Sequence, residues 1–133
     1  MGKGAVSWSS KKQYIIALSS TEAEYIAQTH AAKEALWLRS FLKEICGLQD
    51  APLTINCNNQ GAIALSKDNK FHTRTKHIDI QYHFIREAIE DKKIQVIYIP
   101  TDNNVSDIFT KALTKNKFHR FVELLRLCLI AKQ

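Results

Sequence analysis

The chain has 133 residues, of which 45% are hydrophobic and 24% charged, and its formal net charge is +6. This length suits one small globular domain with a single core, and no apolar run approaches the ~20 residues of a membrane span. The positive charge favours a polyanionic partner, nucleic acid above all. Three widely spaced cysteines (Cys46, Cys57, Cys128) are typical of buried thiols in a reducing, intracellular compartment, cytoplasmic or nuclear.

The first half of the chain predicts a β-hairpin, a long helix and a strand. Residues 5–8 and 14–18 favour two strands joined by the polar turn 9–12. A helix is expected from about residue 22 to 45, with Ser20 or Thr21 as its N-cap and Gly47 at its C-terminus. The alternating run 53–57 predicts the next strand, and a short helix follows over about 60–66.

The second half predicts another long helix, one strand and two further helices. Apolar residues spaced four, three and four apart indicate a helix over about 77–91. Residues 94–99 form the last expected strand, which Pro100 ends. Asn103 or Asn104 is expected to cap a helix through 113, and 118–130 form a terminal amphipathic helix. This order predicts an α/β fold for residues 1–133, with a mixed sheet flanked by helices in a single domain.

One carboxylate, Glu24, lies on the apolar face of the first predicted helix. At about 100° per residue, Ala27 and Ala31 fall within about 60° of its direction, so we expect this face to meet the sheet. A carboxylate on a buried face needs a compensating partner, and a divalent cation is one. Thr21-x-x-Glu24 is also the signature of a capping box, so both roles stay open.

A second carboxylate, Asp107, is expected in the first turn of the helix after the last strand, where an anion suits the helix dipole. Asn104-x-x-Asp107 favours a capping role over a catalytic one. The residue is also expected to face away from the apolar stripe of its helix.

Basic residues gather in two stretches, 67–77 and 111–120, and either supply salt-dependent phosphate contacts or form an ordinary solvated surface. The candidates for nucleic-acid contact are Lys67, Lys70, Arg74, Lys76, Lys111 and Lys115.

Several motifs together are more specific than any single residue. The stretches are WSSKKQ (8–13), ALSSTEAEY (17–25), CNNQGAI (57–63), RTKHIDI (74–80), YHFIRE (82–87) and NVSDIFTKAL (104–113). They closely resemble the ribonuclease H domain that ends the Pol polyprotein of copia-type LTR retrotransposons, and the resemblance runs almost from residue 4 to the C-terminus.

That resemblance implies a ribonuclease H-like fold, a five-stranded mixed sheet in the order 3-2-1-4-5 with helices on its faces. It implies hydrolysis of the RNA strand of an RNA/DNA hybrid, in which four carboxylates hold two Mg²⁺ ions. The family's helix acid falls on Glu24 and the acid after the last strand on Asp107. The acid at the tip of the central strand falls on Asn58, and the first acid belongs to an opening strand that precedes Trp8 in the family.

We therefore expect a truncated ribonuclease H-like domain without the family's first strand, and Mg²⁺ held only weakly by Glu24 and Asp107, because Asn58 is neutral and offers one oxygen. The expected function is that of a catalytically impaired, domesticated module that binds nucleic acid (a hybrid or a duplex) or protein. The alternative is an active ribonuclease completed by upstream residues or by another chain. The missing strand suggests a strand-donating partner or a homodimer, although the half-sheets closing on each other is a further option.

Overall fold

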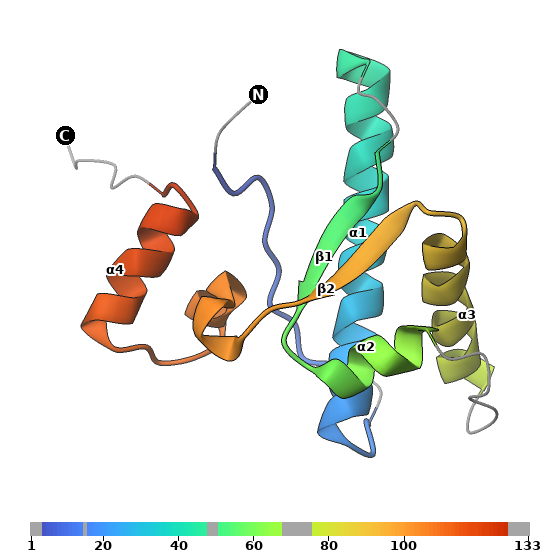
Figure 1. The fold of residues 1–133 in the computed structure, drawn as a ribbon, viewed down its shortest axis with the longest axis horizontal. Coiled ribbons are helices and arrows are strands. Elements are labelled where there is room, and N and C mark those ends of the chain that lie inside the picture. Colours follow the sequence, from blue (N-terminus) through green and yellow to red (C-terminus); the bar gives the residue numbers. More distant parts are fainter. Residues whose placement is uncertain (1–3, 15, 48–50, 68–75, 128–133) are drawn as a thin grey trace. The chain divides into compact units, whose positions relative to one another are not determined.

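The computed structural model describes residues 4–14, 16–47, 51–67 and 76–127, with the backbone alone for 76–79, 81 and 82. These residues form two compact units, which are described separately (Figure 1). One unit combines Met1–Ile15 with Asp102–Gln133, and the larger unit comprises Ile16–Thr101.

The larger unit contains three helices and two strands in its described part. The order along the chain is α1 (Ser20–Cys46), β1 (Leu53–Cys57), α2 (Gln60–Lys67), α3 (Lys76–Glu90) and β2 (Ile94–Tyr98). The two strands pair in parallel, from Leu53 with Ile94 to Cys57 with Tyr98. Figure 1 shows α1 running along the strands, and the parallel pairing requires the crossover that α2 and α3 provide.

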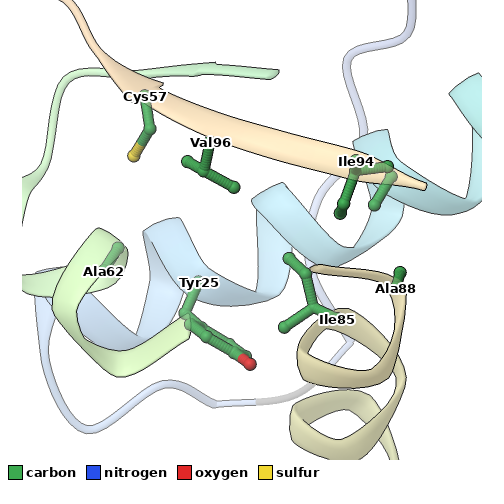
Figure 2. Close-up of a cluster of buried hydrophobic side chains, with 8 residues drawn as sticks. Tyr25, Cys57, Ala62, Ile85, Ala88, Ile94 and Val96 are labelled. Carbon is green, nitrogen blue, oxygen red and sulfur yellow. The ribbon is translucent and has the colours of Figure 1, made fainter. Parts of the chain in front are cut away.

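The core of this unit lies between one face of the strand pair and the helices. Ile94 and Val96 of β2 are buried, whereas Gln95 between them is exposed, as the two-residue period of a strand requires. Figure 2 shows Cys57, Val96 and Ile94 extending from the sheet toward the helices. Each large apolar side chain buried here contributes about 1.5–3 kcal/mol. The buried cluster comprises Tyr25, Ala32, Cys57, Ala62, Ile85, Ala88, Ile94 and Val96.

The face that α1 buries differs from the predicted one. Tyr25 and Ala32 belong to the core, whereas Glu24, Ala27 and Ala31 are exposed. The buried stripe is rotated by about one residue, or 100°, from the expected stripe. Burying the large Tyr25 ring removes more apolar area from water than burying alanines would, and this accounts for the rotation.

Short polar contacts fix the ends of these elements. Gly47 ends α1 in the left-handed conformation, with φ of 62°, as the sequence predicts. The Arg39 guanidinium of α1 donates at 3.1 Å to the carbonyls of both Ala51 and Lys93, which precede β1 and β2. The backbone N–H of Leu53 also donates to Lys93 O at 3.0 Å. Arg39 therefore ties the start of the strand pair to α1.

The smaller unit contains the 3₁₀ helix η2 (Val105–Phe109) and helix α4 (Lys115–Leu124), and the 3₁₀ turn η1 (Thr101–Asn103) precedes them. An extended segment, residues 4–14, accompanies them: Ala5 N donates to Leu125 O at 3.1 Å. The Trp8 ring stacks on Phe109 of η2 with centroids 5.1 Å apart and planes 3° from parallel.

The structure confirms most of the central elements and corrects those at both ends of the chain. Strands 53–57 and 94–98 and helices α1, α2 and α3 agree with prediction within three residues. The predicted hairpin is wrong, because residues 4–14 and 16–19 contain no strand. Side chains that would need a covered sheet face are exposed there, Tyr14 by 103% and Ile16 by 86%, and an uncovered hairpin is only marginally stable.

Two predicted C-terminal helices are also corrected. The helix expected through 113 is the 3₁₀ helix η2, which ends at Phe109. The amphipathic helix begins at Lys115 and ends at Leu124, and residues 128–130 lie outside the described residues. The α/β class is confirmed, and the sheet in the described residues consists of two parallel strands. No helix in the described ranges is both long and apolar enough to cross a membrane.

Candidate functional site

The N-terminus of α1 shows which residues cap the helix. Ser19 is the N-cap, and its hydroxyl accepts from Glu22 N at 3.1 Å. The Glu22 carboxylate in turn accepts from Leu18 N at 2.6 Å. The residues that cap the helix are therefore Ser19 and Glu22, with Glu22 reaching the N–H of the residue before the N-cap, and not Thr21 and Glu24. This settles one alternative, because Glu24 does not cap α1.

Glu24 is exposed, but its charge acts on the end of β1. The pKa of the buried Cys57 thiol is raised from 9.0, mainly by burial. A hydrogen bond with the Asn59 backbone lowers this pKa, and the negative charge of Glu24 raises it further. Among the described residues, the Glu24 carboxylate makes no hydrogen bond or ion pair. The acid thus stands near the strand end with both oxygens uncommitted to described partners.

The two amides after β1 have different roles. Asn59 caps α2: its Oδ1 accepts from Ala62 N at 3.0 Å, and its carbonyl accepts from Ile63 N at 3.1 Å. The Cys57 thiol and the Asn59 backbone contact each other at 3.5 Å, which closes the turn. Asn58 is half-buried, and its side chain has no hydrogen bond to any described residue. Asn59 is therefore structural, and Asn58 is the residue that a site here would use.

A close contact brings the first turns of α1 and α2 together. A Cβ on Gly61 of α2 would lie 3.0 Å from Thr21 Cγ2 and 3.1 Å from Thr21 Oγ1. A Cβ at these distances would be closer than ordinary van der Waals contact, so glycine suits this approach. Asn58 lies just before α2, and Glu24 follows Thr21 by three residues in α1. The contact between Gly61 and Thr21 therefore holds the backbone segments that carry Asn58 and Glu24 close together.

Asp107 belongs to the smaller unit, and its surroundings are well defined. Asp107 is only 4% exposed, whereas the sequence predicted that it would face away from the apolar side of its helix, so that prediction is wrong. Asp107 Oδ1 pairs with Lys111 Nζ at 3.0 Å and accepts from Asn104 Nδ2 at 3.3 Å. Because η2 is a 3₁₀ helix, its residue directions differ from those of the α-helix expected there.

The structure describes only part of the predicted basic surface. Lys67 is exposed at the end of α2, and Lys115 is exposed at the start of α4. Lys111 is paired with Asp107. Lys70 and Arg74 lie outside the described residues, as does the side chain of Lys76. Further along α4, Lys117 Nζ pairs with Asp102 at 3.1 Å and Arg120 Nη2 donates to Asn103 Oδ1 at 2.8 Å.

Sequence reasoning missed three contacts that shape the candidate site. Asp107 and Lys111 are four residues apart, the spacing of side-chain pairs on a helix, so their pairing had a readable signal. Ser19-x-x-Glu22 fits the capping-box signature as well as Thr21-x-x-Glu24 does, so the pattern alone does not distinguish them. The approach of Gly61 to Thr21 had no local signal. Within the described ranges, no three or more His, Cys, Asp or Glu side chains gather where they could hold a metal ion.

Comparison with known proteins identifies relatives. The chain is 49% identical over 121 residues to the retrovirus-related Pol polyprotein from transposon TNT 1-94 of Nicotiana tabacum, covering 91% of this chain and 9% of that protein. It is 39% identical to the corresponding polyproteins from transposons RE1 and RE2 of Arabidopsis thaliana, covering 91% of this chain and 8% of each. No protein-family model and no solved structure matches the chain. The chain is therefore a homologue of a segment, less than a tenth in length, of the Pol polyproteins from retrovirus-related plant transposons.

Proposed function

We propose that the chain is a ribonuclease H-type domain of copia-type Pol origin, in which metal-dependent cleavage of RNA in RNA/DNA hybrids is impaired and nucleic-acid binding is retained. The observation that carries the proposal is the end of β1. A neutral, half-buried Asn58 stands there, where the motif resemblance places a metal-binding aspartate. Asparagine nearly reproduces the shape of aspartate, so the fold tolerates it, but it brings no charge and one oxygen.

The donor set does not suit a pair of Mg²⁺ ions. Magnesium gives up its waters reluctantly and is held mainly through carboxylates and substrate phosphates. Glu24 supplies one carboxylate near the end of β1, and Asn58 adds none. The Asp107 carboxylate already has a cation, the Lys111 ammonium at 3.0 Å, which a metal would have to displace. Within the chain, the position of one family acid therefore holds the neutral Asn58, and one of the two carboxylates present is paired with an ammonium group.

Nucleic-acid binding is supported by charge. The chain carries 19 Lys and Arg against 13 Asp and Glu, and the exposed Lys67 and Lys115 are available for phosphate contacts. Such contacts are independent of sequence and sensitive to salt. The formation of a stable oligomer that is insensitive to salt and to nucleic acid would favour the protein-binding role instead.

The direct test is cleavage of a labelled RNA/DNA hybrid by the full chain with Mg²⁺ or Mn²⁺. We expect no turnover above a protein-free control. Asn58→Asp restores a carboxylate at the strand end and is expected to raise any residual cleavage. Asn59→Asp is the matched control, because it adds the same charge one residue away and aspartate caps a helix as well as asparagine does. Robust turnover by the unmodified chain would refute the proposed impairment.

A second candidate is an active ribonuclease completed by another chain or by upstream residues. It is favoured by the exposed Glu24 carboxylate, which has no partner among the described residues and acts electrostatically on the end of β1. The test is the same cleavage assay after addition, in trans, of the segment that precedes the matched region in a polyprotein relative. A gain in turnover that Glu24→Gln abolishes would support this candidate.

A further inference from the structure

Residues 8–14 of the smaller unit form an exposed segment that combines aromatic rings with cations, and neither the candidate site nor the predicted basic clusters include it. Trp8 is 66% exposed and Tyr14 is fully exposed. Lys11 and Lys12 between them are exposed as well. Residues 4–14 contain no acidic residue, so no carboxylate of this segment offsets the two ammonium groups.

The surface is hollowed beside these residues. A hollow of about 600 Å³ is lined by Lys11, Lys12, Gln13 and Tyr14. Its lining thus offers two cations and one aromatic ring to a single ligand.

The Trp8 ring is held in place for stacking. One of its faces packs on Phe109 at 5.1 Å with the planes 3° from parallel, while two thirds of the residue stays exposed. Tyr14 follows Trp8 by six positions, which span at most about 22 Å. The segment therefore presents two rings with two cations between them along one extended stretch.

This chemistry fits a single nucleic-acid strand. In proteins that bind single strands, unstacked bases stack on aromatic side chains while basic side chains contact the phosphates. Every base can stack in this way, so such binding tolerates any sequence. A duplex offers its phosphates but keeps its bases stacked inside, so it cannot use the rings. We propose that residues 8–14 bind single-stranded RNA or DNA, with Trp8 and Tyr14 stacking on bases and Lys11 and Lys12 contacting phosphates.

The inference rests on the proposed nucleic-acid binding and names a surface and a strand type for it. The chain has two tryptophans, which gives a matched pair of reporters. In Trp37→Phe only Trp8 fluoresces, and titration with a 12-nucleotide single strand is expected to quench it. In Trp8→Phe only Trp37 remains, 60% exposed on α1, and its emission is expected to stay unchanged.

Binding of the same labelled oligonucleotide, followed by fluorescence anisotropy at several salt concentrations, separates the two kinds of contact. Replacing Lys11 and Lys12 together by Gln is expected to lower the slope of log K against log salt by about 1.4, or about 0.7 per phosphate contact. Lys92→Gln with Lys93→Gln, an adjacent pair in the other unit, is the charge-matched control and is expected to leave the slope unchanged. Tyr14→Ala is expected to weaken binding about 5- to 100-fold by losing one stacked base.

Tyr14 is fully exposed, so its variant keeps the fold, and circular dichroism verifies this for each variant. If the segment variants bind like the unmodified chain, the inference is overturned while nucleic-acid binding stands. If a hybrid duplex binds more tightly than the single strand and depends on the same residues, the single-strand assignment is overturned. If the unmodified chain binds no nucleic acid, both the inference and the proposed binding function are overturned.

Discussion

Replacing Gly61 by alanine tests the contact that joins the first turns of α1 and α2. The added Cβ would lie 3.0 Å from Thr21 Cγ2, 3.1 Å from Thr21 Oγ1 and 3.2 Å from Asn59 Oδ1. Ordinary contacts of this kind begin at 3.4 Å, so three neighbours would have to move by several tenths of an ångström. Thr21 is β-branched and stiff at χ1, and Asn59 is held by its cap.

The expected magnitude follows from two opposing terms. Overpacking of this kind costs about 1–3 kcal/mol, and alanine regains at most about 1 kcal/mol over glycine through its helix propensity. The net loss in the free energy of unfolding is therefore about 1 kcal/mol, which corresponds to a fall in Tm of about 3–5 °C for a chain of this size.

Urea unfolding followed by circular dichroism measures this loss. Thr21→Ser removes the nearest atom, Cγ2, and Gly61→Ala is expected to cost about half as much in that background as alone. The reasoning is refuted if Gly61→Ala is as stable as the unmodified chain, or if its cost is the same in both backgrounds.

Three further changes test local features of the larger unit by urea unfolding. Asn59→Ala removes the cap of α2 and is expected to lower the free energy of unfolding by about 1 kcal/mol. Asn59→Asp keeps the cap, so equal losses of stability in both variants would contradict the capping role. Lys92 lies in the turn after α3, which ends at Glu90, and has φ of 54° with its N–H bonded to Ile89 O at 2.9 Å. Lys92→Gly is therefore expected to stabilise the fold by about 0.5–1 kcal/mol, and a loss of stability would contradict this. Burial raises the pKa of the Cys57 thiol above 9.0, so the contribution of the neutral thiol to stability is complete below pH 9.0 and declines as the pH rises above it. The difference in the free energy of unfolding between the unmodified chain and Cys57→Ala is therefore expected to shrink as the pH rises above 9.0, and a widening would contradict the shift.

Most of the larger unit could be predicted from the sequence because its signals are local. The alternation in β1 and β2, the spacing in α3 and the glycine that ends α1 each depend on a few neighbouring residues. The face that α1 buries was not predictable in this way. The buried face includes the polar Gln28 and Thr29, so the apolar pattern does not mark it, and the burial of the large Tyr25 ring depends on contacts with distant elements.

The structure at the two ends of the chain could not be predicted, because a strand-like composition leads to a strand only where a neighbouring strand pairs with it. Residues 5–8 and 14–18 have the composition of strands, but a strand needs a neighbour, and in the described part the sheet consists of β1 and β2. At the site, Asn58 could be placed from its position after an alternating run. The pairing of Asp107 with Lys111 was readable from their spacing, while the approach of Gly61 to Thr21 depends on how two helices meet.

Calorimetric titration of the full chain with Mn²⁺ near neutral pH measures directly whether Glu24, Asn58 and Asp107 can hold paired metal ions. We expect weak binding by the unmodified chain and binding tighter by about tenfold or more in Asn58→Asp, because changes even in the outer ligand shell alter affinity by about 10–100-fold. Asn59→Asp is expected to bind like the unmodified chain. Tight binding of two ions by the unmodified chain, undiminished by Glu24→Gln, would contradict the account.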